Sequence, residues 1–91
     1  MRLALGSVWI MEERVALISA VVEKYDNIEE FNAVLHEYNQ YIIGRMGVPY
    51  RKKNISVISV AVDAPPDIIN AISGKLGRLD GISVKTLLSK V

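Results

Sequence analysis

The sequence predicts an α+β protein of the ferredoxin-like class. This is a two-layer sandwich of β-α-β-β-α-β order, with two helices covering one face of a four-stranded antiparallel sheet. Two apolar stretches rich in β-branched residues, 14–23 and 55–63, are typical of strands, and helical spacing of apolar residues follows each. In this topology the first and third strands are central. They are also the two most apolar strands of the chain, which supports the prediction.

The first predicted strand, residues 14–23, contains no glycine or proline. Its alternate positions form two sets, namely Val15, Leu17, Ser19 and Val21, and Ala16, Ile18, Ala20 and Val22. Both sets are mainly apolar, which is typical of a strand covered on both faces.

The first predicted helix follows a turn at residues 25–27. Asn27 is the expected N-cap, and Glu30 lies three residues later, as in a capping box. Apolar residues then recur at helical spacing and form one stripe, consisting of Ile28, Phe31, Val34, Leu35 and Tyr38. This stripe is predicted to face the core.

A short second strand is predicted from residue 41 to residue 46 or 48. Gly44 and Gly47 interrupt it and Pro49 follows it. These residues indicate an edge strand, because proline cannot donate to a ladder and glycine weakens a strand interior. A turn at residues 50–54 leads into the third strand.

The second predicted helix opens at Pro65 and Pro66, since proline is tolerated in a first turn. Its buried stripe consists of Ile68, Ile69, Ile72, Leu76 and Leu79. Gly81 is expected to end the helix. The last strand, residues 82–89, is less apolar and carries Lys85, which suits an edge position.

The chain has 91 residues, which suits one small domain, and we predict a domain over residues 13–91 after an N-terminal extension of residues 1–12. The net charge of +1 provides no global field for nucleic acid or membrane. Cysteine is absent, which excludes disulfides and is compatible with a reducing cytoplasm. No apolar run approaches the roughly 18 residues that cross a bilayer. We therefore predict a cytoplasmic protein without membrane contact.

The sheet face away from the helices should be polar at alternate positions if it meets water. Both central strands instead carry aliphatic residues on both faces. Four or more exposed aliphatic side chains would each forgo about 1 kcal/mol of burial, and such a patch usually marks an interface. We predict a homo-oligomer, a dimer or tetramer, that associates through the open sheet face. The alternative is that the extension folds over this face.

Residues 36–53 hold the only histidine and three of the four tyrosines. The candidate contacts for a small-molecule effector or a protein partner are His36, Tyr41, Arg45, Tyr50 and Arg51. Basic and aromatic residues of 45–53 could also contact nucleic-acid phosphates. For the basic residues, a solvated hairpin turn without a binding role is favoured over an effector or partner contact and over a nucleic-acid contact. Direct DNA binding through this hairpin is the alternative function.

The sequence lacks recognisable catalytic machinery. It has no P-loop, no nucleophile elbow and no dinucleotide-binding glycine motif. His36 has no second histidine or cysteine to accompany it, whereas transition-metal sites normally use three or four such ligands. We predict no catalytic residues, no metal and no cofactor.

Three segments resemble a known family: residues 38–51 (YNQYIIGRMGVPYR), 58–64 (ISVAVDA) and 74–86 (GKLGRLDGISVKT). They are similar to small proteins described as iron-only hydrogenase system regulators, and the resemblance runs from about residue 13 to residue 91. That family is in turn similar to the regulatory domain of the CopG-type nickel-responsive repressor, an ACT-like ferredoxin fold that assembles through its sheets.

The resemblance implies a non-catalytic, oligomeric regulatory or ligand-sensing module. By this resemblance the protein is a transcriptional regulator of an iron-only hydrogenase system. The repressor's nickel site uses histidines and a cysteine, and of these types the chain has only His36. The expectation therefore concerns the regulatory fold and does not extend to a nickel site.

Overall fold

The computed structural model describes residues 2–5 and 8–91. The domain consists of β3 (Arg14–Val22), α1 (Ile28–Glu37), β4 (Ile42–Tyr50), β5 (Ile55–Ala64), α2 (Pro66–Gly77) and β6 (Ile82–Leu88). Two short 3-10 helices, η1 (Asn39–Tyr41) and η2 (Arg51–Lys53), flank β4. Among the described residues, no helix combines the length and the apolar composition needed to cross a bilayer.

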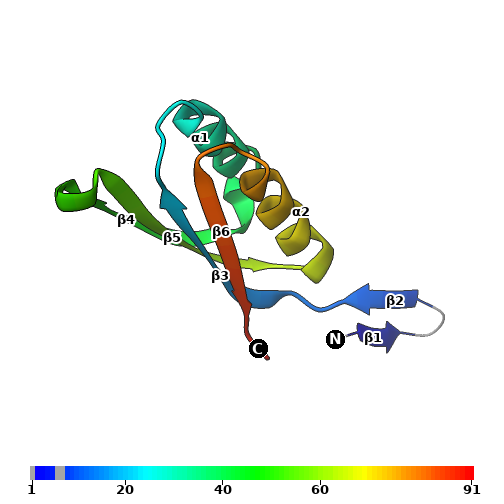
Figure 1. Ribbon diagram of the computed structural model, residues 1–91. Helices are drawn as coiled ribbons and strands as arrows, with labels where there is room; N and C mark the ends of the chain where they lie inside the picture. Colours follow the sequence, from blue (N-terminus) through cyan, green and yellow to red (C-terminus); the bar gives the residue numbers. More distant parts are fainter. Residues whose placement is uncertain (1, 6–7) are drawn as a thin grey trace.

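The four strands of the domain form one antiparallel sheet with the order β4-β5-β3-β6. The two most apolar strands, β3 and β5, are central, as predicted. Both helices lie on the same face of this sheet (Figure 1). The predicted ferredoxin-like two-layer sandwich is therefore confirmed.

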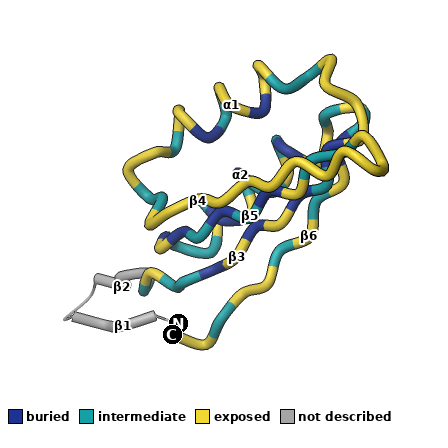
Figure 2. The backbone as a smooth tube through the Cα atoms, turned by 90° about the vertical axis from the view of Figure 1, so that its left-hand side faces the viewer, coloured by how far each residue is buried: buried dark blue, intermediate teal, exposed yellow. Residues whose placement is uncertain are grey.

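The hydrophobic core lies between the helices and the sheet. From Ala16 to Val22 of β3 the even-numbered residues are buried, whereas their odd-numbered neighbours are half-buried or exposed (Figure 2). The buried side chains of the sheet are Ala16, Ile18, Ala20, Val22, Ile58, Val60, Val62, Ala64 and Ile82. The helices bury Phe31, Leu35, Ile69, Ile72 and Leu76. Removal of these side chains from water stabilises the fold, and the helical stripes predicted from the sequence are confirmed.

Strand β4 is longer than predicted, because it continues through Pro49 to Tyr50. The predicted edge position is correct, since β5 is its only neighbour in the four-stranded sheet. Proline is tolerated on an edge strand, where one side of the backbone has no ladder partner. The pairing register shifts between Ile42 and Gly44, which marks a β-bulge at the start of the strand.

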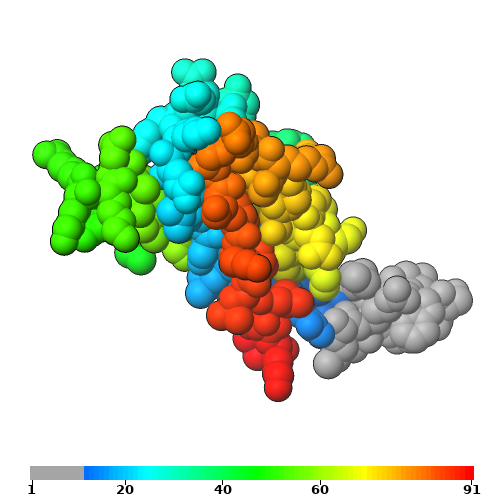
Figure 3. Space-filling view, in the orientation of Figure 1, coloured from blue at the N-terminus to red at the C-terminus, as the bar shows by residue number. Residues whose placement is uncertain are grey.

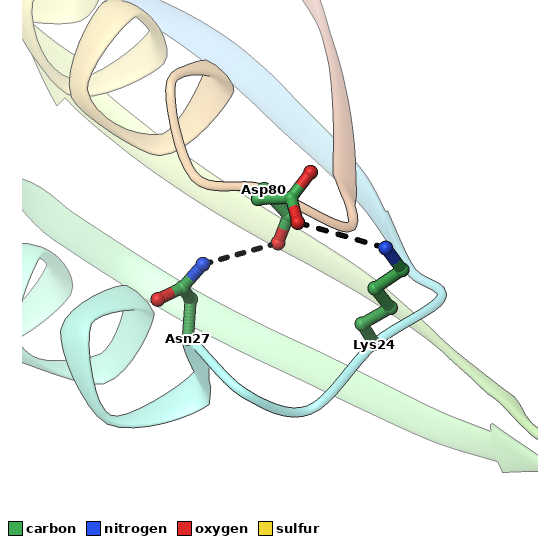
Figure 4. Close-up of polar contacts among 3 residues, drawn as sticks. All are labelled: Lys24, Asn27 and Asp80. Carbon is green, nitrogen blue, oxygen red and sulfur yellow. Dashed lines mark hydrogen bonds and ion pairs between the residues drawn. The ribbon is translucent and has the colours of Figure 1, made fainter.

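Asn27 occupies the N-cap position of α1, but the predicted capping box does not form. Its side chain makes no capping hydrogen bond. The Nδ2 atom instead donates to the backbone carbonyl oxygen of Asp80, at 3.2 Å (Figure 4). The carboxylate of Asp80 also lies 3.6 Å from the Nζ atom of Lys24. Asn27 therefore ties the β3–α1 turn to the α2–β6 turn, two segments that only the folded sheet brings together.

The prediction that Gly81 ends the second helix is wrong, because α2 ends at Gly77. Gly81 lies in the turn before β6 and has a φ of 79°. Its carbonyl oxygen accepts hydrogen bonds from the backbone N–H groups of Glu23 and Lys24, at 2.7 and 3.2 Å. A Cβ atom at Gly81 would lie 2.5 Å from the Cβ atom of Lys24. Both the positive φ and this close approach require glycine.

Two further strands, β1 (Arg2–Leu5) and β2 (Val8–Met11), precede the domain and pair with each other in a separate two-stranded antiparallel sheet (Figure 1). Residues 1, 6 and 7 of the predicted extension lie outside the described residues. The boundary between extension and domain at residue 12 stays a prediction.

Candidate functional site

The uncovered face of the sheet carries apolar side chains that are exposed to solvent. On the two central strands, Leu17 is 40% exposed and Val57 is 45% exposed. The pairing register places further exposed apolar residues on this same face. We define the open-face patch as Leu17, Met46, Val48, Tyr50, Val57 and Leu87. The alternative expectation, that the N-terminal extension folds over this face, stays a prediction.

A hollow of about 240 Å³ lies within the open face. Its lining residues are Leu17, Gly44, Arg45, Met46, Ser59 and Ala61. The hollow exists because Gly44, Ser59 and Ala61 are small and lie between larger side chains. A Cβ atom at Gly44 would have no heavy atom within 4 Å. This face therefore has room for a side chain from another molecule.

Two of the five predicted contact residues lie together in a second hollow. His36, in the last turn of α1, and Arg45, in β4, both line a cavity of about 480 Å³. We call it the α1–β4 pocket, and its remaining lining residues are Asn32, Leu35, Asn39 and Ile42. The Nη2 atom of Arg45 donates a hydrogen bond to the Oδ1 atom of Asn32, at 3.2 Å.

Asn32 and Asn39 line this pocket, although sequence reasoning did not select them. Asn32 precedes His36 by four residues, which places both on the same face of α1. This spacing is the only feature of the sequence that relates Asn32 to His36. It does not identify a pocket, because the opposite wall comes from β4, and only the folded chain places that strand beside α1.

The other three predicted contact residues do not join the α1–β4 pocket. Tyr41 lies in η1, is half-buried and packs against the hydrophobic core. Tyr50 ends β4 and Arg51 begins η2. Tyr50 lies five residues beyond Arg45, which corresponds to about 17 Å along a strand. The predicted set is therefore divided between two ends of one strand.

Arg51, Lys52 and Lys53 form the tip of the β4–β5 hairpin, and all three are exposed. The hairpin tip, coloured green, protrudes from the body of the protein (Figure 3). Asn54 follows in the left-handed region, with a φ of 54°, and completes the turn. The tip presents three consecutive positive charges to solvent.

Lys75 of α2 links the two helices. Its Nζ atom lies 3.0 Å from the Oε2 atom of Glu37 and 4.9 Å from the centre of the Tyr38 ring. The Tyr38 side chain, followed by the Glu37 carboxylate, raises the pKa of Lys75 above its ordinary value of 10.5. The carboxylate of Glu37, which neighbours His36 in the sequence, therefore pairs with Lys75 and does not line the α1–β4 pocket.

Across residues 2–5 and 8–91, no group of three or more histidine, cysteine, aspartate or glutamate side chains is arranged to hold a metal ion. The expectation that the protein uses no metal, like the expectation that it uses no cofactor, stays a prediction.

Comparison with known proteins identifies relatives of the domain. Residues 14–86 match the family model described as "TM1266-like: Iron-only hydrogenase system regulator, putative". A solved structure, described as "The structure of uncharacterized protein TM1266 from Thermotoga maritima", superimposes with a TM-score of 0.82 at 34% sequence identity. The alignment covers 87% of this chain and 100% of that chain. A search of curated proteins gave no match.

The family match covers both helices, the strands β3, β4 and β5, and most of β6. It therefore includes the α1–β4 pocket and the open-face patch apart from Leu87. The resemblance drawn from residues 38–51, 58–64 and 74–86 is confirmed at the level of the family. The chain belongs to the TM1266-like family, whose description is "Iron-only hydrogenase system regulator, putative".

Proposed function

We propose that this protein is a non-catalytic, cytoplasmic oligomer that acts as a regulatory, ligand-sensing module of an iron-only hydrogenase system. Membership of the TM1266-like family carries this proposal, because the family is described as a regulator and its description names no reaction. The low net charge of +1 and the open-face patch support a module that acts through self-association and contacts with other molecules. An ACT-like association through sheets is part of the same proposal.

The regulatory role is tested in cells. Deletion of the gene is expected to change hydrogenase transcript levels, measured by quantitative PCR under conditions that induce the hydrogenase. Re-expression of the protein should restore them. Transcript levels that stay unchanged in the deletion strain under inducing and non-inducing conditions would contradict the proposal.

Self-association is proposed to occur through the open-face patch, because exposed apolar patches usually mark interfaces. Met46 is a good probe, since it is 66% exposed and lies beside the hollow of this face. Met46→Glu should shift the protein from oligomer to monomer in sedimentation velocity, because a charge would be buried unpaired. Val91→Glu is the matched control, since it adds the same charge at an exposed aliphatic residue of the C-terminus.

Gly44→Phe provides a second test of the same surface. The large side chain fits the monomer, because nothing lies within 4 Å of a Cβ atom at this position. It would fill the hollow and keep a second molecule from packing there. An oligomer that persists in both Met46→Glu and Gly44→Phe would place self-association elsewhere.

Direct DNA binding is the alternative function, and the exposed basic residues 51–53 favour it. It predicts binding to hydrogenase promoter DNA that weakens steeply with salt and falls in Arg51→Ala and Lys52→Ala. Fluorescence anisotropy at low and near-physiological salt separates the alternatives. Sequence-preferring binding at near-physiological salt would favour the DNA-binding protein, whereas weak low-salt binding alone would favour a sensor that acts through a partner.

A further inference from the structure

The α1–β4 pocket combines a charged group, neutral polar groups and an apolar floor. Four of its six lining side chains are polar: Asn32, His36, Asn39 and Arg45. The other two are Leu35, which is buried, and Ile42, which is half-buried. Its volume of about 480 Å³ falls in the range of small-molecule sites.

The guanidinium group of Arg45 gives the pocket its positive charge. Its hydrogen bond goes to the amide oxygen of Asn32, which carries no net charge. Within the described residues, the ion pairs are Lys24 with Asp80 and Lys75 with Glu37, and Arg45 takes part in neither. No lining residue of the pocket is acidic. An anion beside Arg45 would therefore meet an uncompensated positive charge.

The arrangement also limits the kind of anion. A guanidinium fork matches the two oxygens of a carboxylate. Ile42, which is half-buried, offers an apolar surface for a short hydrocarbon chain. A free amino acid would bring an ammonium group as well, and no lining carboxylate is present to pair with it. The pocket thus fits a carboxylate with an apolar chain and no positive charge.

We propose that the α1–β4 pocket binds a small aliphatic monocarboxylate, whose carboxylate pairs with Arg45 and whose chain packs on Ile42. Asn32, His36 and Asn39 supply additional hydrogen-bonding groups at the rim. This inference rests on the sensing role proposed above and names the chemical class of its effector.

The experiment is a titration of ¹⁵N-labelled protein with isocaproate, followed by NMR. Leucine, which is isocaproate with an added ammonium group, and isocaproamide, which lacks the negative charge, are the matched probes. Isocaproate should shift the backbone amide signals of residues 32–45 in a saturable manner. Leucine and isocaproamide should bind about two- to fivefold more weakly, because leucine brings an ammonium group with no carboxylate partner in the pocket and isocaproamide loses the charge pair with the exposed Arg45.

Arg45→Gln should weaken isocaproate binding about two- to fivefold, because the charge pair with an exposed arginine is lost. Arg51→Gln removes the same charge at the hairpin tip and should leave binding unchanged. Asn39→Asp, which adds a negative charge to the pocket wall, should weaken binding and decides the question if Arg45→Gln does not fold.

Absence of saturable shifts in residues 32–45 would overturn the proposal. So would equal losses in Arg45→Gln and Arg51→Gln, or leucine binding as tightly as isocaproate. If isocaproate does not bind but hydrogenase transcripts change in the deletion strain, only the proposed monocarboxylate site is contradicted. If isocaproate binds but transcripts stay unchanged, the regulatory role is contradicted and the proposed site is retained.

Discussion

The two faces of the central strands have nearly the same composition but opposite surroundings. On β3, Ile18 is 1% exposed beneath the helices, whereas its neighbour Leu17 is 40% exposed on the other face. On β5, Val60 is buried and Val57 is exposed. Residue type alone does not distinguish these positions, because aliphatic side chains occupy both sides of each strand.

The difference shows that a hydrophobic residue stabilises the monomer only where another layer covers it. Two helices are enough to cover one face of a four-stranded sheet, and residues 12–91 place no such layer on the other face. Burial of an aliphatic side chain contributes about 1.5–3 kcal/mol, and this contribution is realised only in part on the open face of a monomer. We expect substitutions on the two faces to have different consequences.

The largest expected effect is on the covered face. Ile18→Ala should lower the free energy of unfolding by about 2–5 kcal/mol, because it removes buried methyl groups and leaves a cavity. Leu17→Ala should cost less than Ile18→Ala in dilute protein, because the Leu17 side chain is already 40% exposed. Urea denaturation followed by circular dichroism gives both values.

Protein concentration sharpens this first comparison. If the open face mediates association, the cost of Leu17→Ala should increase as protein concentration rises, because binding to the native state adds stability. The cost of Ile18→Ala should stay large at every concentration. Equal costs for the two substitutions in dilute protein would mean that the open face is covered within the monomer.

Two glycines, Gly81 in a turn and Gly44 on the edge strand β4, allow a constrained position to be compared with an open one. Gly81→Ala should destabilise the protein by about 1–3 kcal/mol, because alanine is strained at a φ of 79° and its Cβ atom would meet Lys24. Gly44→Ala, at the open edge, should be neutral or stabilise by up to about 1 kcal/mol. Thermal unfolding of the two variants is the measurement, and a similar loss in both would show that Gly44 is also constrained.

Two hydroxyl groups on β6 allow the covered face and the open face to be compared with a smaller expected effect. The Oγ1 atom of Thr86 donates to the Oγ atom of Ser73 on α2, at 2.8 Å, in a part-buried position. Thr86→Val should cost about 1 kcal/mol, because Ser73 loses its partner. Ser83→Ala, at an exposed open-face position of the same strand, should change stability by less than about 0.5 kcal/mol. A larger effect at Ser83 would contradict the assignment of the two faces.

The smallest expected effect concerns the exposed contact between the helices. The pKa of Lys75 is raised in the folded state, so its contribution to stability is complete below the ordinary value of 10.5 and is lost as the pH rises through the raised value. The stability difference between wild type and Lys75→Met should therefore shrink between neutral pH and strongly alkaline pH. Urea denaturation across this range is the measurement, and a difference that stays constant would rule out this contact as the cause.

The sequence determined the two α-helices and four strands of the domain, their order and the sheet topology, but not the strand pair β1–β2 of the extension. Periodicity located both helices and their buried stripes, and the apolar character of residues 14–23 and 55–63 identified the central strands. These features are local, since they depend on spacing within one segment. The edge position of β4 was also predictable, because Gly44, Gly47 and Pro49 each weaken a strand interior.

Only the tertiary structure decided how distant residues combine. In the folded chain the Asn27 side chain donates to the backbone carbonyl oxygen of Asp80 and does not cap α1, and α2 ends before Gly81. The tertiary structure also divided the predicted contact residues, because Arg45 faces α1 whereas Arg51 lies at the far end of the hairpin. A pocket such as that of His36 and Arg45 needs two walls from separate elements. Their distance depends on packing of the whole layer, which no local pattern in the sequence encodes.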